Sequence, residues 1–319
     1  MALYAFGVDP LFYHTQSAVT TSEDGITWSR LSAPFEVHEA CVSAAHNTVT
    51  GDWLATSGGG SLSHTVDPTT TWQSYTMNNT FTNLRKVISN NGRFIAVGTR
   101  KDPITNQEVA VIQTSTSGED ELAWSINSLS TYDHSGLTDV FHVNGDQLMA
   151  VGYGTGMASP LALRSLDNGV TWSELVLTGV TGPIWCGAVQ GTQIWLGGQG
   201  IIFTNSNWST GNTYSSSLPL RAMNKAKPIT KITNVGTAVV ACQSDQIWYT
   251  RTGYDWLSAR VEGYTFISAA LWDSTVFLGA SSLLNQYSAF TTTNLATLNE
   301  PVTLTGVNIG VQVFEYLAV

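Results

Sequence analysis

The chain has 319 residues and a formal net charge of −10, and charged residues make up only 11% of it. Nucleic-acid binding as the main task is disfavoured, because contact with phosphates needs a basic face. No stretch approaches the roughly 18 apolar residues that cross a membrane, so we expect no membrane insertion. The first residues, Met-Ala-Leu-Tyr-Ala-Phe, lack the basic and apolar regions of a signal peptide.

Seven short apolar runs, each ending in small residues, recur along the chain. They lie at residues 3–7, 53–57, 94–98, 148–152, 194–198, 239–243 and 276–280. Thr and aromatic residues are common and no long segment has a helical period, which favours strands. Short strands at intervals of about 40 to 50 residues are typical of the blades of a β-propeller.

A turn motif follows each apolar run, and its fullest copy is Ser165-x-Asp167-x-Gly169-x-Thr171-Trp172. The Asp can accept hydrogen bonds from the backbone of its own turn, the Gly can take a positive φ, and the Trp offers an apolar face for burial. Degraded copies place an aromatic or apolar residue at Trp28, Trp72, Trp124, Trp208, Trp256 and Leu295. We therefore expect Glu23, Asp67 and Asp167 to form turns rather than to act as catalytic acids.

The S-x-D-x-G-x-T-W spacing resembles the Asp-box (BNR-like) repeat of sialidases and other β-propellers. The resemblance and the seven-fold count predict an all-β protein: a seven-bladed propeller of four-stranded antiparallel blades, forming a single domain over residues 1–319. Counted outward from the axis, the apolar run is the second strand, and the turn motif joins the third strand to the fourth. Residues 3–7 have no strand before them, so we expect the strand-like segment 307–319 to pair with them and close the ring.

Loops on the side opposite the turn motifs are the predicted functional face, because binding residues concentrate on loops held by a rigid scaffold. The longest crossover, near residues 209–231, holds a basic cluster of Arg221, Lys225, Lys227 and Lys231 that is a candidate anion site. Arg100 lies in another long loop, 99–108. Tyr13, Tyr132 and Tyr153 are candidates for stacking on a ligand, with ordinary loop packing as the alternative.

Enzymatic chemistry finds little support in the sequence. The Arg-Ile-Pro element of sialidases is absent, and Arg30 lies on the wrong side of its blade for an arginine clamp. The two His–carboxylate neighbours, His38-Glu39 and Asp133-His134, would point to opposite faces of a strand. The three cysteines, at positions 41, 186 and 242, have neither disulfide nor metal-site spacing and are expected to be buried. We expect no catalytic residue, no metal and no cofactor.

The surface must be built from Ser, Thr, Asn and Gly, as in proteins exposed outside a cell, yet an export signal is lacking. The irregular repeats are similar to those of propeller proteins of bacteriophage virions. The leading hypothesis is a non-enzymatic tail or capsid component, assembled in the host cytoplasm and exposed outside, whose partners are other virion proteins or a cell-surface receptor or glycan. Two alternatives stay open: a glycan-binding or glycan-hydrolysing propeller, and an intracellular assembly factor, since Asp-box-like propellers also serve photosystem assembly.

Overall fold

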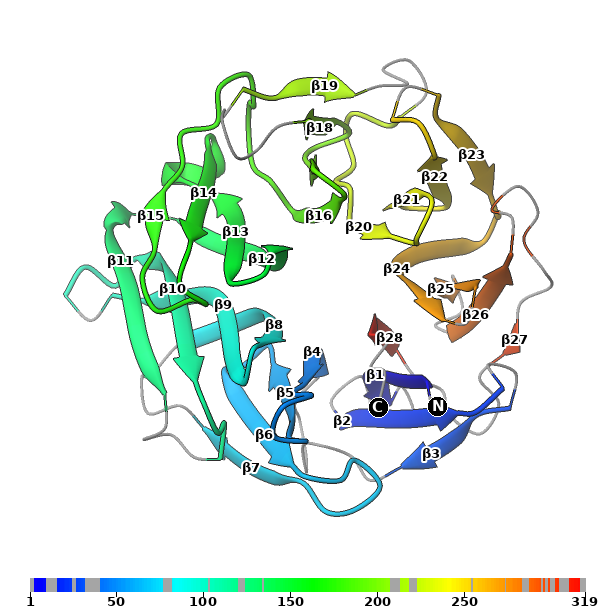
Figure 1. The fold of residues 1–319 in the computed structure, drawn as a ribbon, viewed down its shortest axis with the longest axis horizontal. Helices are drawn as coiled ribbons and strands as arrows, with labels where there is room; N and C mark the ends of the chain where they lie inside the picture. Colours follow the sequence, from blue (N-terminus) through cyan, green and yellow to red (C-terminus); the bar gives the residue numbers. More distant parts are fainter. Residues whose placement is uncertain are drawn as a thin grey trace.

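The structure is a computed structural model of the chain. It describes residues 3–9, 16–24, 27–31, 41–76, 82–102, 104–119, 124–133, 135–206, 213–217, 223–253, 255–272, 274–282, 287–293, 295, 298, 302–303 and 310–315. These residues form four-stranded antiparallel sheets arranged as a ring around a central axis (Figure 1).

Six blades are each built from four consecutive strands, which follow one another from the axis outward. They are β4 (Cys41–His46), β5 (Trp53–Ser57), β6 (Ser61–Thr65) and β7 (Gln73–Thr76); β8 (Thr82–Asn90), β9 (Arg93–Lys101), β10 (Glu108–Ser115) and β11 (Ser125–Asp133); β12 (Gly136–Asn144), β13 (Gln147–Tyr153), β14 (Pro160–Ser165) and β15 (Ser173–Glu174); β16 (Cys186–Gln190), β17 (Gln193–Gly197), β18 (Ile202–Asn205) and β19 (Ser215–Ser217); β20 (Lys231–Asn234), β21 (Val239–Gln243), β22 (Gln246–Thr250) and β23 (Leu257–Arg260); β24 (Tyr264–Trp272), β25 (Thr275–Ser282), β26 (Tyr287–Thr292) and β27 (Val302–Thr303). A short 3-10 helix, η3 (Thr155–Met157), follows β13.

The remaining sheet, the closing sheet, draws on both ends of the chain. Its order is β28 (Gly310–Glu315), β1 (Leu3–Asp9), β2 (Gln16–Ser22) and β3 (Ser29–Leu31). β28 pairs antiparallel with β1, so that Tyr4 lies opposite Glu315. The predicted count of seven blades is corrected to six blades of consecutive strands plus this composite sheet. The motif count overstates the number of self-contained blades because the closing sheet contributes its own apolar run and turn.

The apolar runs of the sequence all form second strands: β1, β5, β9, β13, β17, β21 and β25. In this position both faces of a strand are covered by neighbouring sheets, so the strand reads as a continuous apolar run. Phe94, Trp195 and Phe277 on these strands are buried. The buried side chains form clusters between adjacent sheets, for example between β8–β10 and β12–β14. The core is therefore a ring of contacts between sheets.

The turns that join third to fourth strands define one side of the ring, the turn face, together with the tight turns between first and second strands. In the fullest motif, Asp167 accepts hydrogen bonds from Thr171 N at 2.8 Å and Thr171 Oγ1 at 2.6 Å. Ser165 Oγ donates to Asp167 Oδ1 at 2.8 Å and accepts from Gly169 N at 2.8 Å. The positive φ of Gly169, 79°, completes the turn. The turn role predicted for Asp167 is confirmed.

Two degraded copies of the motif give different outcomes. Asp67 accepts from Thr69 N at 2.9 Å and Thr69 Oγ1 at 2.7 Å, as expected of a turn residue. The role predicted for Glu23 is wrong, because its neighbour Asp24 accepts from Ser22 Oγ at 3.0 Å and Thr27 N at 2.7 Å. That turn is one residue shorter than the parent, and the shortening moves the carboxylate acceptor by one position.

Four of the described turn tryptophans pack at the boundary between two sheets, and Trp28 is buried. Trp72, Trp124 and Trp256 are buried, and Trp172 is partly buried. Trp256 meets Trp195 edge to face, with ring centroids 5.6 Å apart. Trp208 lies outside the described residues. The motif therefore serves the fold twice: its Asp satisfies the turn, and its Trp seals the space between neighbouring sheets.

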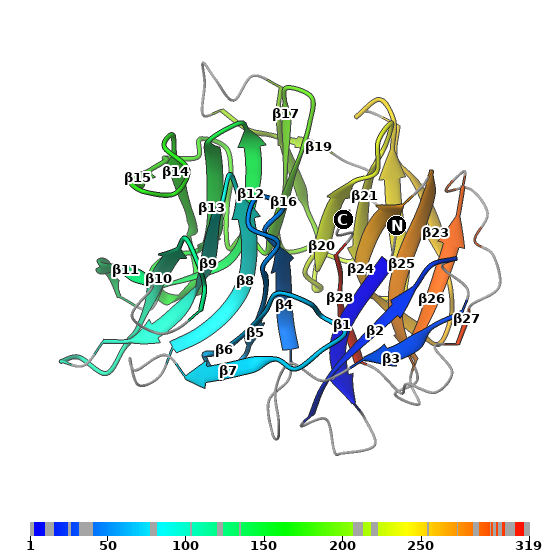
Figure 2. The same ribbon diagram turned by 60° about the horizontal axis from the view of Figure 1, so that its bottom comes forward.

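The opposite side of the ring is the loop face. It carries the connections between second and third strands and the crossovers from each fourth strand to the next first strand, and Figure 2 shows the ring tilted so that the strands are seen from the side. The first strands begin at this face, so their first residues surround one end of the central channel.

Candidate functional site

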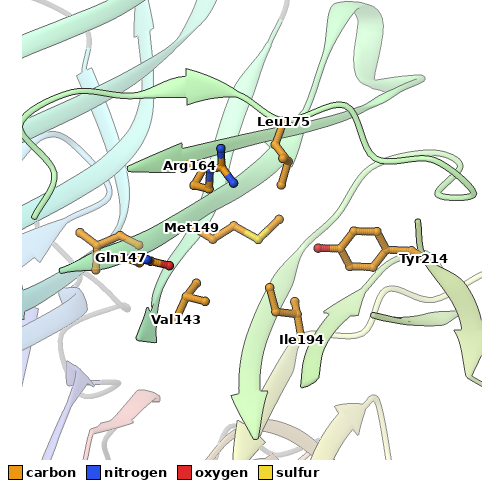
Figure 3. A pocket seen from close by; sticks show the side chains of 8 residues that line it. Val143, Gln147, Met149, Arg164, Leu175, Ile194 and Tyr214 are labelled. Atoms are coloured by element: carbon orange, nitrogen blue, oxygen red, sulfur yellow. The ribbon is translucent and has the colours of Figure 1, made fainter. Parts of the chain in front are cut away.

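The cavities between the described residues include two of very different size. The smaller is about 10 Å³ and lies between blades β12–β15 and β16–β19, where Met149, Arg164, Ile194 and Tyr214 converge (Figure 3). Burial raises the pKa of Tyr214 to about 12, so its hydroxyl stays protonated. A space of this size holds at most one water molecule. This cavity is therefore a packing gap between two blades.

The larger cavity, about 110 Å³, lies at the mouth of the central channel on the loop face, and we call it the mouth cavity. Its lining comes from six first strands and from the residues just before two of them: Val42, Arg85, Lys86, Thr138, Asp139, Trp185, Cys186, Thr230, Lys231, Ile267 and Ser268. Several separate first strands thus contribute to one site, and the volume is sufficient for a few water molecules or a small group of a ligand.

Backbone bulges build this wall. Four first strands change register at the same relative point, at Val42, Arg85, Thr138 and Ile267. On a regular strand two adjacent side chains point to opposite faces. A bulge sets two residues against one of the partner strand and redirects its side chains. Consequently adjacent pairs such as Arg85 and Lys86 both line the mouth cavity.

Gly98 in β9 and Gly152 in β13, which end two of the apolar runs, are explained by the same bulges. A Cβ at Gly98 would lie 2.1 Å from the backbone oxygen of Asn83, and one at Gly152 would lie 1.9 Å from that of Gly136. Only glycine lets the backbones approach so closely at these two positions.

The mouth cavity is cationic within an acidic protein, since Arg85, Lys86 and Lys231 meet a single carboxylate, Asp139. Burial and, to a lesser extent, repulsion from Lys231 lower the pKa of Lys86 to about 7, and Asp139 opposes the shift. Asp139 is buried and committed to the backbone: its two oxygens accept from Val140 N and Gly187 N, both at 2.9 Å. The side chains facing the cavity therefore carry an excess of positive charge.

Cys186 also lines the cavity, but it is not a nucleophile. Burial raises the pKa of its thiol well above the ordinary value, and its Sγ donates to the backbone oxygen of Ile229 at 3.4 Å. A protonated, buried thiol does not attack an electrophile. In the described part of the chain, no group of three or more His, Cys, Asp or Glu is arranged to hold a metal ion.

The predicted basic cluster leads to the mouth cavity without lining it, except through Lys231. Lys225 and Lys227 are exposed on the loop before β20, and Lys227 Nζ donates to Ser244 Oγ at 2.7 Å. Gln243 fixes this loop through bonds to the backbone of Asn224 and Lys227. Arg221 lies outside the described residues.

The other predicted residues lie on strands or outside the description. Arg100 is partly buried near the end of β9, beside Asp102, whose pKa is lowered by hydrogen bonds from Thr105 and Ile104 and by Arg100. Tyr153 is buried on β13, and its ring lies 6.2 Å from that of Trp185 in the cavity wall. Tyr132 is in β11, and Tyr13 lies outside the described residues. Arg100 and Tyr153 are not among the residues that line the mouth cavity.

Arg85, Lys86 and Asp139 were missed by the sequence analysis. A charged residue just ahead of a continuous apolar run was the available signal. A first strand is covered by neighbouring sheets on both faces, so its charged side chains have only the axis in which to be solvated. Lys86 precedes β9 by seven residues and Asp139 precedes β13 by eight, and both lie on the first strand of the blade.

Comparison with models of protein families finds no match, and comparison with curated proteins finds none either. Among solved structures, YCF48 from Cyanidioschyzon merolae is similar, with a TM-score of 0.62 and 14% identity over 88% of this chain and 90% of that one. A structure of YCF48 bound to D1 peptide has a TM-score of 0.60 and 12% identity, covering 82% and 80%. Sqt1 from Saccharomyces cerevisiae has a TM-score of 0.62 and 11% identity, covering 98% and 87%.

At these identities the comparisons show a β-propeller fold. They overturn the leading hypothesis of the sequence analysis, because these similar structures are YCF48 and Sqt1 rather than bacteriophage tail or capsid components. They give no support to glycan binding. No helix in the described part of the chain is long and apolar enough to cross a membrane.

Proposed function

We propose that this protein is an assembly factor that acts inside the cell without catalysing a reaction, and that it binds a segment of a protein partner on its loop face. We further propose that the turn motifs are degenerate Asp-boxes that serve the scaffold. Both proposals separate the molecule into a side that maintains the fold and a side that meets the partner.

The distribution of lysine is the observation that carries the proposal. The chain has five lysines, and all of them lie on the loop face or in the mouth cavity: Lys86, Lys101, Lys225, Lys227 and Lys231. The arginines do not share this asymmetry, since Arg93, Arg164 and Arg251 lie at or next to the turn-face ends of their strands, so it is lysine that distinguishes the loop face of this acidic protein. Such a face attracts partners of opposite charge and suppresses encounters in the wrong orientation.

Two further observations support it. One of the similar structures, YCF48, is a propeller bound to a peptide, so this fold accommodates a protein segment. The three cysteines, Cys41, Cys186 and Cys242, are free and buried, which suits a reducing compartment.

Cross-linking in the source cell tests the proposal. A tagged copy is treated with an amine-reactive cross-linker, and linked peptides are identified by mass spectrometry. We expect one protein partner linked through Lys225, Lys227 or Lys101. As a matched control, Val66→Lys places an exposed lysine on the turn face, where Val66 is 72% exposed. Links that form mainly through the lysine at position 66, or links that scatter over many unrelated proteins, would contradict the proposal.

A further inference from the structure

The mouth cavity has a chemistry more specific than general attraction to acidic proteins. Arg85, Lys86 and Lys231 contribute three cationic side chains, and the buried carboxylate of Asp139 already accepts two backbone N–H groups. Charge in a partly enclosed site is stabilised by a counter-charge at short range. The cavity is therefore suited to a negatively charged functional group of a ligand.

Size narrows the class of ligand. A volume of about 110 Å³ is well matched to a group of a few atoms. Carboxylates are the small anionic groups that proteins supply, as chain termini and as Asp or Glu side chains. Lysine and arginine bind carboxylates through charge-assisted hydrogen bonds.

We propose that the mouth cavity binds one carboxylate group of the partner, held by Lys86 and Lys231 with Arg85 beside them. This inference rests on the proposed function for the source of the carboxylate, since the partner segment on the loop face supplies it. Binding of a free carboxylate to the same residues is independent of the partner and is measured separately.

The environment of Lys86 couples this binding to a proton. The pKa of Lys86 is about 7, so the amine is largely neutral above that pH. A carboxylate beside it favours the ammonium form and raises the pKa. Above about pH 7, and up to the raised pKa of Lys86 in the complex, binding therefore takes up a proton, and affinity falls with rising pH by up to about tenfold per unit. Below about pH 7 this dependence disappears.

Several charged or titratable groups lie around Lys86 and the mouth cavity. They are Arg85 on the same strand, Asp139 and His142 on β12, Cys186 on β16, Lys231 on β20 and Cys242 on β21. The pKa of His142 is lowered from an ordinary value of 6.5, and the thiol pKa values are raised above 9.0. His142 therefore titrates below the pH range of this proton uptake, and the thiols titrate above pH 9.0.

The test uses the full chain with ¹³C-labelled lysine and two probes, acetyl-Gly-Gly-Ala with a free carboxylate and the same peptide as its amide. The Lys86 Cε resonance is assigned by its loss in Lys86→Met, and thermal unfolding checks that this variant is folded. We expect the acid to raise the titration midpoint of Lys86 by about one pH unit or more and the amide to leave it unchanged. The Lys225 resonance, from an exposed loop lysine, should not move.

A conservative variant distinguishes the effect of the positive charge at position 86 on binding from the effect of its protonation. Lys86→Arg keeps a permanent cation, so it should bind the acid with an affinity that no longer falls between pH 7 and pH 9. A Lys86 midpoint that does not respond to the acid, or responds equally to the amide, would overturn the inference. A stronger response to inorganic phosphate than to the peptide would overturn the assignment to a carboxylate.

The two proposals fail in different ways. If the peptide raises the titration midpoint of Lys86 but no partner is cross-linked to the loop face, the carboxylate site is supported and the assembly function is contradicted. If a partner is cross-linked through Lys225 and Lys227 but its binding is unchanged in Lys86→Met, the assembly function stands and the carboxylate site falls.

Discussion

The two faces of the ring use charged side chains in different ways. On the turn face, Asp24, Asp67 and Asp167 each accept hydrogen bonds from their own turn. On the loop face, Lys86 and Lys231 line a shared cavity at the channel mouth, and Lys225 is exposed on a loop. The carboxylates of the turn motifs accept hydrogen bonds that maintain the fold, whereas these loop-face lysines line a cavity or lie exposed.

The comparison of the two faces indicates which residues of a repeat protein are candidates for function. Residues that recur from blade to blade with the same local partners belong to the scaffold, even when they are acidic and exposed. Positions whose residue type differs from blade to blade, such as Arg85 at a bulge that has Val42, Thr138 and Ile267 at its equivalents, are the candidates for binding. Bulges are often found beside functional sites, and in this ring they form the wall of the cavity.

The largest expected effect is at the mouth of the channel. Gly152→Ala places a Cβ 1.9 Å from the backbone oxygen of Gly136, so the two strands must separate. We expect a loss of about 3 kcal/mol or more in the free energy of unfolding, measured with urea. Gly58→Ala, whose Cβ meets only Val42 at 3.6 Å, is the matched control on the same face. Equal stability of the two variants would contradict the idea that the close approach of the backbones at the bulges supports the site.

A smaller effect is expected on the turn face. Asp167→Ala removes the acceptor for Thr171 N, Thr171 Oγ1 and Ser165 Oγ, at an expected cost of about 1 kcal/mol. Glu23→Ala should change the free energy of unfolding by less than about 0.5 kcal/mol, because its neighbour Asp24 forms the turn. A comparable loss in both variants would show that the turn register is that of the sequence motif after all.

Acid should reduce the difference between wild type and Asp167→Ala. Hydrogen bonds from Thr171 hold the pKa of Asp167 below its ordinary value of 3.8. The stability from this shift is complete above about pH 4 and is lost as the pH falls through the lower, folded-state pKa. Urea unfolding at pH 6 and near pH 3 should therefore show a smaller difference between the two proteins in acid. A difference that grows in acid would contradict the turn role of Asp167.

The smallest effect on stability is expected for the exposed lysines of the loop face. Lys227→Met loses one exposed hydrogen bond, to Ser244 Oγ, and should cost less than about 0.5 kcal/mol. Lys225→Met should cost no more. Thermal unfolding of both variants beside wild type checks this, and a clear loss would mean that the loop face, too, uses its charges for folding.

The fold was more predictable from sequence than the site was. The second strands are buried on both faces, so each appears as a continuous apolar run, and the turn tryptophans mark the sheet boundaries. The predicted number of blades was wrong because the closing sheet is built from both ends of the chain. The predicted turn carboxylate was wrong because this turn is one residue shorter than the parent motif, so that Asp24 rather than Glu23 accepts the hydrogen bond. Both differences leave the periodic pattern intact.

The site depends on geometry that a periodic pattern cannot express. Strict alternation would send Arg85 and Lys86 to opposite faces of β8, and likewise Thr138 and Asp139 on β12. The bulges bring both members of each pair to the same cavity. The bulges leave only an indirect trace in the sequence. Gly98 in β9 and Gly152 in β13 mark the places where the backbones of two neighbouring strands come close.

The pairing of β1 with β28 has a consequence for how the chain folds during synthesis. β1 leaves the ribosome long before β28, so the contact that closes the ring joins residues that are far apart in the sequence. Such a high contact order makes closure late and slow, and until then β1 presents an unpaired edge to other nascent chains. A pause in translation before residue 310 would prolong this exposure, and the yield of folded protein should then depend on chaperones that protect open sheet edges.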